Sequence, residues 1–241
     1  MFLLLLIGLV FGLGISWATG APLAAPMTGE ASPGQELYGE HCSSCHGLLG
    51  QGTDQGPPLV GAGAAAVDFM LSTGRMPLAD PHQPMLRESP RFTRREIDAL
   101  LAYIASLGSG GPSIPSVDLT QGNLVQGRQL FMENCAACHG ADGQGAAVNL
   151  GEVAPSLHVA TPTQIAEAIR TGPGPMPRFG EKVVDQSDLD SLVRYVYALR
   201  SIHDPGGAGL GHEGPVIEGF VAWLAGLGLM ILLTRMIGTT T

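Results

Sequence analysis

The sequence has few charges, few aromatic side chains and no lysine or arginine before Arg75. Charged residues make up 14% of the 241 residues and aromatic residues 5%, whereas there are 35 glycines and 18 prolines. Such a composition is poor material for a large sheet core and favours small helical domains joined by long loops. The length allows two small domains or one of medium size. A net charge of −9 argues against nucleic acid as a partner.

The missing basic residues bear on the N-terminal segment. Residues 2–17 are apolar apart from Ser16, and a stretch rich in alanine and proline follows. An export signal normally begins with a basic region, which is absent here. About 16–18 apolar residues are marginal for spanning a bilayer core of roughly 30 Å. A signal cleaved near residues 18–20 and a retained membrane anchor therefore both remain open.

The C-terminal end predicts a membrane-spanning helix. Residues 219–237 are apolar except for Thr234 and Arg235, which is close to the roughly 20 residues that a spanning helix needs. Trp223 lies near its start, where an interfacial aromatic is expected, and Arg235 lies at the end predicted to face the cytoplasm. Because no further domain follows to cover it, a buried helix of a soluble core is the weaker reading.

The middle of the chain contains an internal repeat. Gly34–Cys42 matches Gly127–Cys135, and a Cys-His-Gly triplet follows in each copy. Each copy predicts an opening helix, a cysteine motif, loops, a short helix, a Met-Pro loop and a closing helix. The short helices are expected near 64–73 and 163–171.

The closing helices carry the clearest helical signal. Ile97, Leu100, Leu101 and Ile104 fall on one apolar face, and the second copy repeats the pattern at Leu189, Leu192, Val193 and Val196. Residues 93–96 fit a capping box for the first closing helix. The fold expected from these signals is all-α.

All four cysteines lie in two C-x-x-C-H motifs, Cys42–His46 and Cys135–His139. This spacing is the attachment signature of c-type haem, because two thiols one helical turn apart can each bond one vinyl group of a porphyrin. The adjacent His46 and His139 then serve as proximal iron ligands. A thioredoxin-type dithiol or one zinc held by both pairs is the alternative. Neither needs a histidine after each motif, so we expect two covalent haems c, attached at Cys42, Cys45, Cys135 and Cys138.

The sixth ligand of each iron is expected to be a thioether or an imidazole. Met76 and Met176 lie in matching Met-Pro loops and are the favoured candidates; the alternative interpretation is that they are ordinary packing methionines. His82 and His158 are their rivals. Met70, Met85 and Met132 have no suitable position in the repeat. Arg75 is open to two readings, a haem-propionate partner or a solvated surface residue.

The predicted organisation has six parts. They are an N-terminal signal or membrane segment with linker at 1–33, a first domain at 34–108, a linker at 109–126, a second domain at 127–203, a juxtamembrane linker at 204–216 and a transmembrane helix at 217–238.

These features resemble the dihaem cytochrome cc subunit of actinobacterial-type cytochrome bcc menaquinol oxidoreductases. The resemblance rests on the tandem C-x-x-C-H domains, the runs at 56–61 and 72–77, the loop at 176–179 and the single C-terminal helix. It implies two tandem small cytochrome c domains held outside the cytoplasmic membrane by one or two membrane passes.

The resemblance also implies a place in an electron-transfer chain. A cytochrome b subunit would oxidise menaquinol, and a Rieske iron–sulfur protein would pass electrons to the haem of Met76. The haem of Met176 would deliver them to the copper-bearing subunit of a terminal oxidase. The chain is then an electron-transfer subunit of an oxidoreductase, with no substrate chemistry of its own.

Three other functions compete with this reading. A membrane-anchored dihaem carrier could shuttle between unrelated complexes. A dihaem peroxidase needs one iron with an open site, which the equivalent Met76 and Met176 argue against. A haem-based sensor would need a signalling domain, and no such domain is expected from the sequence.

Overall fold

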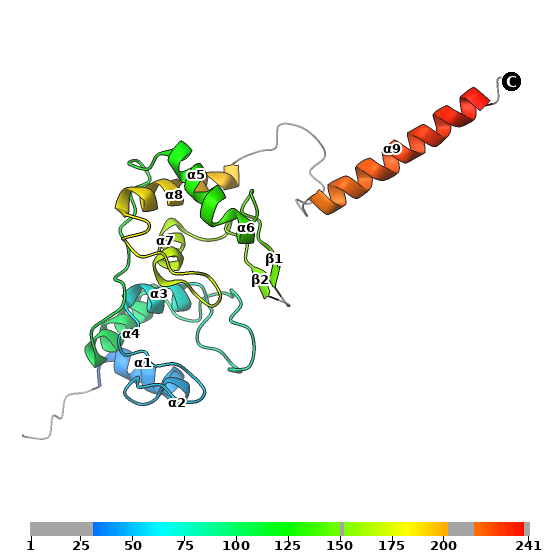
Figure 1. Ribbon diagram of the computed structural model, residues 1–241. Coiled ribbons are helices and arrows are strands. Elements are labelled where there is room, and N and C mark those ends of the chain that lie inside the picture. Colours follow the sequence, from blue (N-terminus) through cyan, green and yellow to red (C-terminus); the bar gives the residue numbers. More distant parts are fainter. Residues whose placement is uncertain (1–30, 150–151, 202–214, 239–241) are drawn as a thin grey trace, which may run out of the picture. The chain divides into compact units, whose positions relative to one another are not determined.

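The computed structural model describes residues 31–149, 152–201 and 215–238, and these are mostly helical (Figure 1). The all-α prediction is confirmed, with one small two-stranded sheet added. The N-terminal segment predicted at 1–33 lies, except for its last three residues, outside the described part. The elements are α1 Pro33–His41, α2 Ser43–His46, α3 Ala64–Ser72, α4 Arg94–Leu107, α5 Leu124–Asn134, α6 Ala136–His139, β1 Ala146–Asn149, β2 Glu152–Ala154, α7 Pro162–Thr171, α8 Gln186–Ala198, the 3₁₀ turn η1 Leu199–Ser201 and α9 Pro215–Gly238.

The first helical module, α1 to α4, is built around the contact of its opening and closing helices. The predicted capping box starts α4, because the Thr93 side chain accepts from the Glu96 amide and the Glu96 side chain accepts from Thr93. The apolar face of α4 is buried at Ile97, Leu100 and Ile104. Together with Tyr38 of α1 and apolar residues of α3, these side chains form one core.

The second module, α5 to η1, repeats this arrangement with α5 packed on α8. All four predicted residues of the closing helix, Leu189, Leu192, Val193 and Val196, are buried. Helix α5 begins three residues before the predicted position, because the side chain of Asn123 caps the amides of the two residues at positions 125 and 126.

A glycine lets the helices of each pair approach closely. A Cβ at Gly34 would collide with the carbonyl oxygen of Ala99 in α4, and a Cβ at Gly127 would collide with that of Ser191 in α8. The aromatic residue four positions later then packs on a tyrosine of the closing helix. The ring centroids are 5.2 Å apart for Tyr38–Tyr103 and 5.5 Å apart for Phe131–Tyr195. The repeat seen in the sequence is therefore a repeat of packing.

The hairpin β1–β2 was not expected from the sequence. It pairs Ala146 with Ala154 and Ala147 with Val153 in antiparallel register. It occupies the loop after the second cysteine motif, which is longer than the loop after the first one.

The two modules contact each other through α3 and α7, which lie side by side in Figure 1. Gln164 of α7 is buried at this boundary. Its side-chain amide donates to the backbone oxygen and the hydroxyl of Ser72, at 3.2 Å in each case. The same Gln164 completes a capping box with Thr161 at the start of α7.

Helix α9 is the one candidate membrane span among the described residues. The stretch Gly219–Gly238 has a mean hydropathy of 2.0 and is not buried against the rest of the described structure. Large apolar side chains such as Phe220, Trp223 and Leu232 are each more than 60% exposed. Such a surface is costly in water and suits a bilayer.

Candidate haem sites

The histidine of the first cysteine motif is held in one tautomer by the loop that follows it. His46 is 9% exposed, and its Nδ1 lies 2.7 Å from the carbonyl oxygen of Pro57. Because a carbonyl oxygen can only accept, Nδ1 must carry the hydrogen in this bond. The lone pair is then on Nε2, which is the arrangement that an iron-ligating imidazole requires.

The second motif has the same device at the end of a longer loop. Nδ1 of His139 lies 3.1 Å from the carbonyl oxygen of Pro155, sixteen residues later, compared with eleven residues between His46 and Pro57. The five additional residues accommodate the hairpin β1–β2. Burial lowers the pKa of His139, and the bond to Pro155 only partly opposes this. The imidazole is therefore kept neutral, as a metal ligand must be.

None of the four cysteines forms a disulfide bond. Burial raises the pKa of Cys42 to about 11, with a further contribution from Cys45, and raises the pKa of Cys135 to about 11 in the same way. A redox dithiol needs a lowered pKa, because the thiolate is the nucleophile. The thioredoxin-type alternative therefore loses support.

A shared zinc site also loses support. No group of three or more His, Cys, Asp or Glu side chains comes together in a way that could hold a metal ion within residues 31–149, 152–201 and 215–238. The two cysteine motifs instead pack on separate cores, with Cys42 on the first and Cys135 on the second.

Met76 is placed by the end of α3. The amides of Arg75 and Met76 both donate to the carbonyl oxygen of Met70, at 3.0 and 3.1 Å. The side chain of Met76 packs against the first core, the same core on which Cys42 packs. One hydrophobic cluster thus carries a motif cysteine and the candidate distal thioether of the first module.

Met176 is placed by a buried arginine. Arg170, 5% exposed in α7, donates to the carbonyl oxygens of Phe179 and Val184, at 3.1 and 2.5 Å. Both bonds fix the part of the loop that follows Met176. The side chain of Met176 packs on the second core together with Cys135. Arg170 has no local sequence signal, because its role depends on contacts across nine and fourteen residues.

The rival ligands lie in different surroundings. His82 is exposed in the loop between α3 and α4, and its backbone amide donates to Oδ1 of Asp80 at 2.9 Å. His158 is engaged elsewhere, since its Nε2 lies 2.8 Å from the carbonyl oxygen of Asp142. Met85 and Met132 are 39% and 45% exposed. Arg75 is not a solvated surface residue, because it is half-buried and stacks 4.8 Å above the ring of Phe69.

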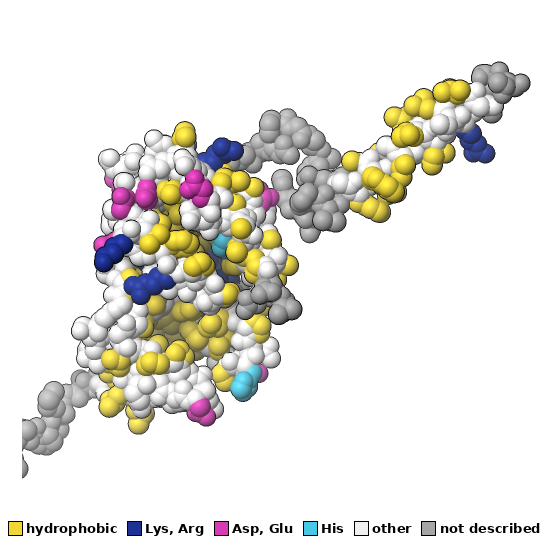
Figure 2. Space-filling view, viewed as in Figure 1, with side chains coloured by type: hydrophobic (Ala, Val, Ile, Leu, Met, Phe, Trp, Pro, Cys, Tyr) yellow, Lys and Arg dark blue, Asp and Glu magenta, His cyan; other side chains and the backbone are white. Residues whose placement is uncertain are grey.

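The donor set of each module fits a haem c. Each module offers two free thiols, an imidazole with its Nε2 lone pair available, and a thioether on the same core. Figure 2 shows hydrophobic side chains lining hollows in the face turned to the viewer. Exposed apolar residues next to the first motif, Leu48 at 75% and Leu49 at 67%, are the kind of surface that a porphyrin or a partner protein covers.

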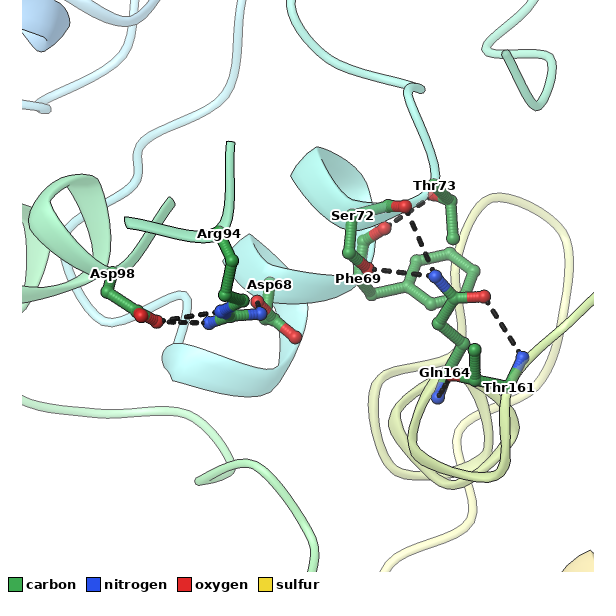
Figure 3. A network of polar contacts seen from close by, with 8 residues as sticks. All are labelled: Asp68, Phe69, Ser72, Thr73, Arg94, Asp98, Thr161 and Gln164. Carbon is green, nitrogen blue, oxygen red and sulfur yellow. Dashed lines mark hydrogen bonds and ion pairs between the residues drawn. The ribbon is translucent and has the colours of Figure 1, made fainter. Parts of the chain in front are cut away.

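Sequence reasoning missed a polar network at the boundary between the modules (Figure 3). Asp68 of α3 is 4% exposed and pairs with Arg94 at 2.5 Å, and Arg94 also binds Asp98. Glu167 of α7 is fully buried, and neither of its carboxyl oxygens has a hydrogen-bond partner among the described residues. Burial raises the pKa of Glu167 to about 9, and the neighbouring Asp68 adds to this.

Two family descriptions match the two modules. Residues 31–108 match "Cytochrome c", and residues 122–196 match "Cytochrome C oxidase, cbb3-type, subunit III". Both modules are therefore cytochrome c domains, and such domains imply covalently bound haem c.

Curated relatives match nearly the whole chain. A "Cytochrome bc1 complex cytochrome c subunit" of Mycobacterium leprae is 37% identical over 250 residues, covering 98% of this chain and 86% of the relative. Proteins of the same description from Mycobacterium bovis and Corynebacterium efficiens are 39% and 34% identical. They cover 85% and 83% of this chain, and 76% and 73% of the relatives.

Proposed function

The chain belongs to the cytochrome c subunits of cytochrome bc1 complexes, and from this membership we propose that it is a membrane-anchored dihaem relay. Its family places it in electron transfer within a respiratory quinol-oxidising complex. The relay takes electrons from the Rieske and cytochrome b side of a menaquinol-oxidising complex and delivers them to a terminal cytochrome c oxidase.

We assign one haem c to each module. The first is held by Cys42, Cys45, His46 and Met76, and the second by Cys135, Cys138, His139 and Met176. The observation that carries this assignment is the repeated bond from the histidine Nδ1 to a proline carbonyl, 46 to 57 and 139 to 155. It leaves one ring nitrogen for iron in each module, at the residue that directly follows the thiol pair.

Haem c, when bound, supplies an iron that takes up and releases one electron. The chain's own residues would lower the reorganisation energy of that iron and raise its reduction potential. The proline carbonyls fix the imidazole planes, so that the rings do not turn between redox states. The loops pinned by Arg170 and by the end of α3 hold the thioethers in place. A methionine opposite a histidine raises the reduction potential.

The partners proposed are a cytochrome b subunit, a Rieske iron–sulfur subunit and the copper-bearing subunit of a terminal oxidase. The first module would receive electrons and the second would deliver them. The chain thus serves as the electron-transfer subunit of an oxidoreductase, without substrate chemistry of its own. Two equivalent thioether candidates support this over a peroxidase, which needs an open iron.

The location proposed is the outer face of the cytoplasmic membrane, with α9 as the anchor. The apolar and exposed stretch Gly219–Gly238 supports a membrane span. Arg235 near its end supports an orientation with the C-terminus in the cytoplasm, following the positive-inside rule.

The proposal is tested on the tagged full chain, isolated from membranes in mild detergent. We expect two haems c per chain in a pyridine haemochrome assay, together with co-purified cytochrome b and Rieske subunits. Adding a menaquinol analogue should reduce both haems without any added soluble cytochrome c. A Cys135→Ser/Cys138→Ser variant is the matched control and should retain one haem.

Two results would decide against the proposal. One haem per unaltered chain contradicts the dihaem assignment. Two haems in a chain that copurifies with no quinol-oxidising subunit favour the free-standing carrier instead.

A further inference from the structure

Three arginine side chains from both modules come near one another at the boundary. Arg75 and Arg87 lie in the loop between α3 and α4, and Arg200 lies in η1 of the second module. The positive charge of Arg87 acts on the guanidinium of Arg75, so these two side chains are within electrostatic reach of each other. The charge of Arg200 acts on Arg87 in the same way. Arg87 is thus within electrostatic reach of both neighbours.

Each guanidinium is held in place by neutral groups. The guanidinium of Arg75 stacks on Phe69 at 4.8 Å, and that of Arg200 stacks on Tyr197 at 4.4 Å. Arg87 donates through Nη2 to the Oε1 of Gln164 at 2.9 Å. Gln164 is the residue that joins α7 to Ser72 of α3, so the position of Arg87 is tied to the contact between the modules.

Two of these arginines have buried N–H donors without a hydrogen-bond acceptor in the described part of the chain. Nη1 of Arg75 and Nε of Arg200 are buried with no hydrogen-bond partner, and none of the three arginines pairs with a carboxylate within the described residues. Three like charges, half-buried and close together, repel one another unless an anion lies among them. The cluster therefore has the form of an anion site, shared by both modules, whose anion is not a side chain of the described chain.

The positions of the arginines indicate which anion fits. Arg75 directly precedes Met76, which packs on the core of the first haem site. Arg200 directly follows Leu199, a member of the core on which Cys135 and Met176 pack. Each end of the cluster is thus next in sequence to a residue of one module's core, and Arg87 interacts electrostatically with both ends. A haem c carries two propionate carboxylates, and a guanidinium binds a carboxylate through two parallel hydrogen bonds.

We propose that Arg75, Arg87 and Arg200 form one binding site for propionate carboxylates of both haems, across the boundary between the modules. This inference rests on the proposed dihaem function. The arginines are counter-charges for the propionates of both haems, and their positive charge acts on both irons. A change at Arg87 should then affect both haems, whereas changes at Arg75 and Arg200 should act mainly on the first and second haem.

The test measures the two reduction potentials of the full chain by spectroelectrochemistry in detergent. Removing a nearby positive charge stabilises the oxidised, more positive iron, so Arg87→Gln should lower both potentials. We expect roughly a tenfold change in each redox equilibrium, which corresponds to 59 mV for one electron. Arg75→Gln and Arg200→Gln should each lower mainly one potential by a similar amount.

Matched variants separate this role from a general loss of charge. Arg95→Gln in α4 and Arg128→Gln in α5 remove one exposed positive charge each and should leave both potentials nearly unchanged. Arg87→Lys keeps the charge but loses the two-pronged geometry, so it should restore part of the potential that Arg87→Gln loses. Haem content and the His/Met absorption spectrum are recorded for every variant to show that each module is intact.

The outcomes distinguish the inference from the proposed function. If Arg87→Gln keeps two haems and shifts the potentials no more than Arg95→Gln does, the propionate site is wrong. If added inorganic phosphate shifts the potentials of the unaltered chain and Arg87→Gln abolishes that effect, the cluster binds a free anion instead. A haem count below two in the unaltered chain overturns the proposed function, and the shared site with it.

Discussion

Met76 and Met176 differ from other methionines of the chain in what their side chains contact. Both pack on the core that also holds a motif cysteine of their own module, whereas Met85 and Met132 are largely exposed. Two backbone bonds to Met70 and two bonds from Arg170 hold the respective loops. At the scale of single residues, the thioethers are therefore placed by the fold and not by the Met-Pro sequence alone.

We predict that Met76→Ala or Met176→Ala opens one iron. The variant should bind carbon monoxide in its reduced state, and one of the two potentials should fall by on the order of 100 mV, because the axial ligand is a main determinant of haem potential. Absorption spectra with and without carbon monoxide, and a redox titration, measure both effects.

Exposed methionines supply the control for this prediction. Met85→Ala and Met132→Ala remove the same thioether from positions away from the cores and should leave the spectrum native. If Met76→Ala and Met176→Ala also keep native spectra and potentials, the distal ligands are misassigned, and His82 and His158 become the candidates.

At the scale of elements, the crossing of opening and closing helices depends on a glycine in each module. We predict that Gly34→Ala destabilises the first module by about 1–3 kcal/mol, because the added methyl group meets the backbone of Ala99 and the helices must move apart. Gly127→Ala should do the same to the second module through Ser191. Denaturant titrations of the haem-loaded chain give the change in unfolding free energy.

Helix α1 itself contains the matched control. A Cβ at Gly39 meets nothing within 4 Å, so Gly39→Ala adds the same methyl group without a clash. It should be neutral or stabilising by about 0.5–1 kcal/mol, because alanine is the better helix former. Equal stabilities of the Gly34 and Gly39 variants would show that the crossing tolerates the methyl group.

The elements with a regular apolar period could be predicted from the sequence. Both closing helices follow the spacing of 3.6 residues, and the capping box at Thr93 fixes where α4 begins. The start of α5 could not be predicted as well, because the cap of Asn123 lies outside the repeated stretch. The hairpin β1–β2 was missed because Ala146–Ala154 is a short loop insertion without alternating hydrophobicity.

The site residues also fall into two groups, those that local spacing predicts and those that only a tertiary contact brings together. The cysteines, histidines and methionines could be proposed because local spacing carries their chemistry. The arginine cluster and the pair Asp68–Glu167 could not, since they depend on α3 and α7 meeting. Arg87 and Gln164, for example, are 77 residues apart in sequence. Only a tertiary contact brings such residues into reach.

At the scale of the whole molecule, the boundary between the modules holds a carboxyl group that needs its proton. Glu167 faces Asp68 of α3 and Arg94 of α4, and its pKa of about 9 lies above its ordinary value of 4.5, chiefly because of burial. Between these two values the folded chain holds a proton that the unfolded chain releases. The contribution of protonated Glu167 to the stability of the fold is therefore fully present below about pH 4.5 and is lost as the pH rises towards 9.

We predict that unfolding free energy falls by up to about 1.4 kcal/mol per pH unit across this window from Glu167 alone. Glu167→Gln keeps the shape and a hydrogen-bond donor but cannot ionise, so it should flatten the dependence and raise stability at pH 8. Denaturant titrations of the haem-loaded chain between pH 5 and 9 measure this. Glu181→Gln, at an exposed position, is the control and should retain the slope. Parallel curves for Glu167→Gln and the unaltered chain would contradict the prediction.

The last prediction concerns α9 as a tether that keeps the haem domains near their partners. Both cores and all candidate haem-binding residues lie within residues 32–201, so truncation after residue 203 should leave a water-soluble protein with two haems. A tether keeps such a protein near its partner at an effective concentration of about millimolar, which a free protein at native abundance does not reach. Quinol-dependent electron flow to the oxidase should therefore fall steeply in the truncated chain, while chemical reduction of its haems is unchanged.

Replacing α9 with an unrelated membrane helix of the same length separates anchoring from recognition. If the foreign helix restores electron flow in full, α9 acts by confining the haem domains to the membrane. If it restores only part, the surface of α9 itself contacts the complex, because the two chains differ in nothing but the side chains presented to the lipid and to neighbouring helices. Full flow from the truncated chain at native abundance would contradict the anchored relay and favour a carrier that shuttles by diffusion.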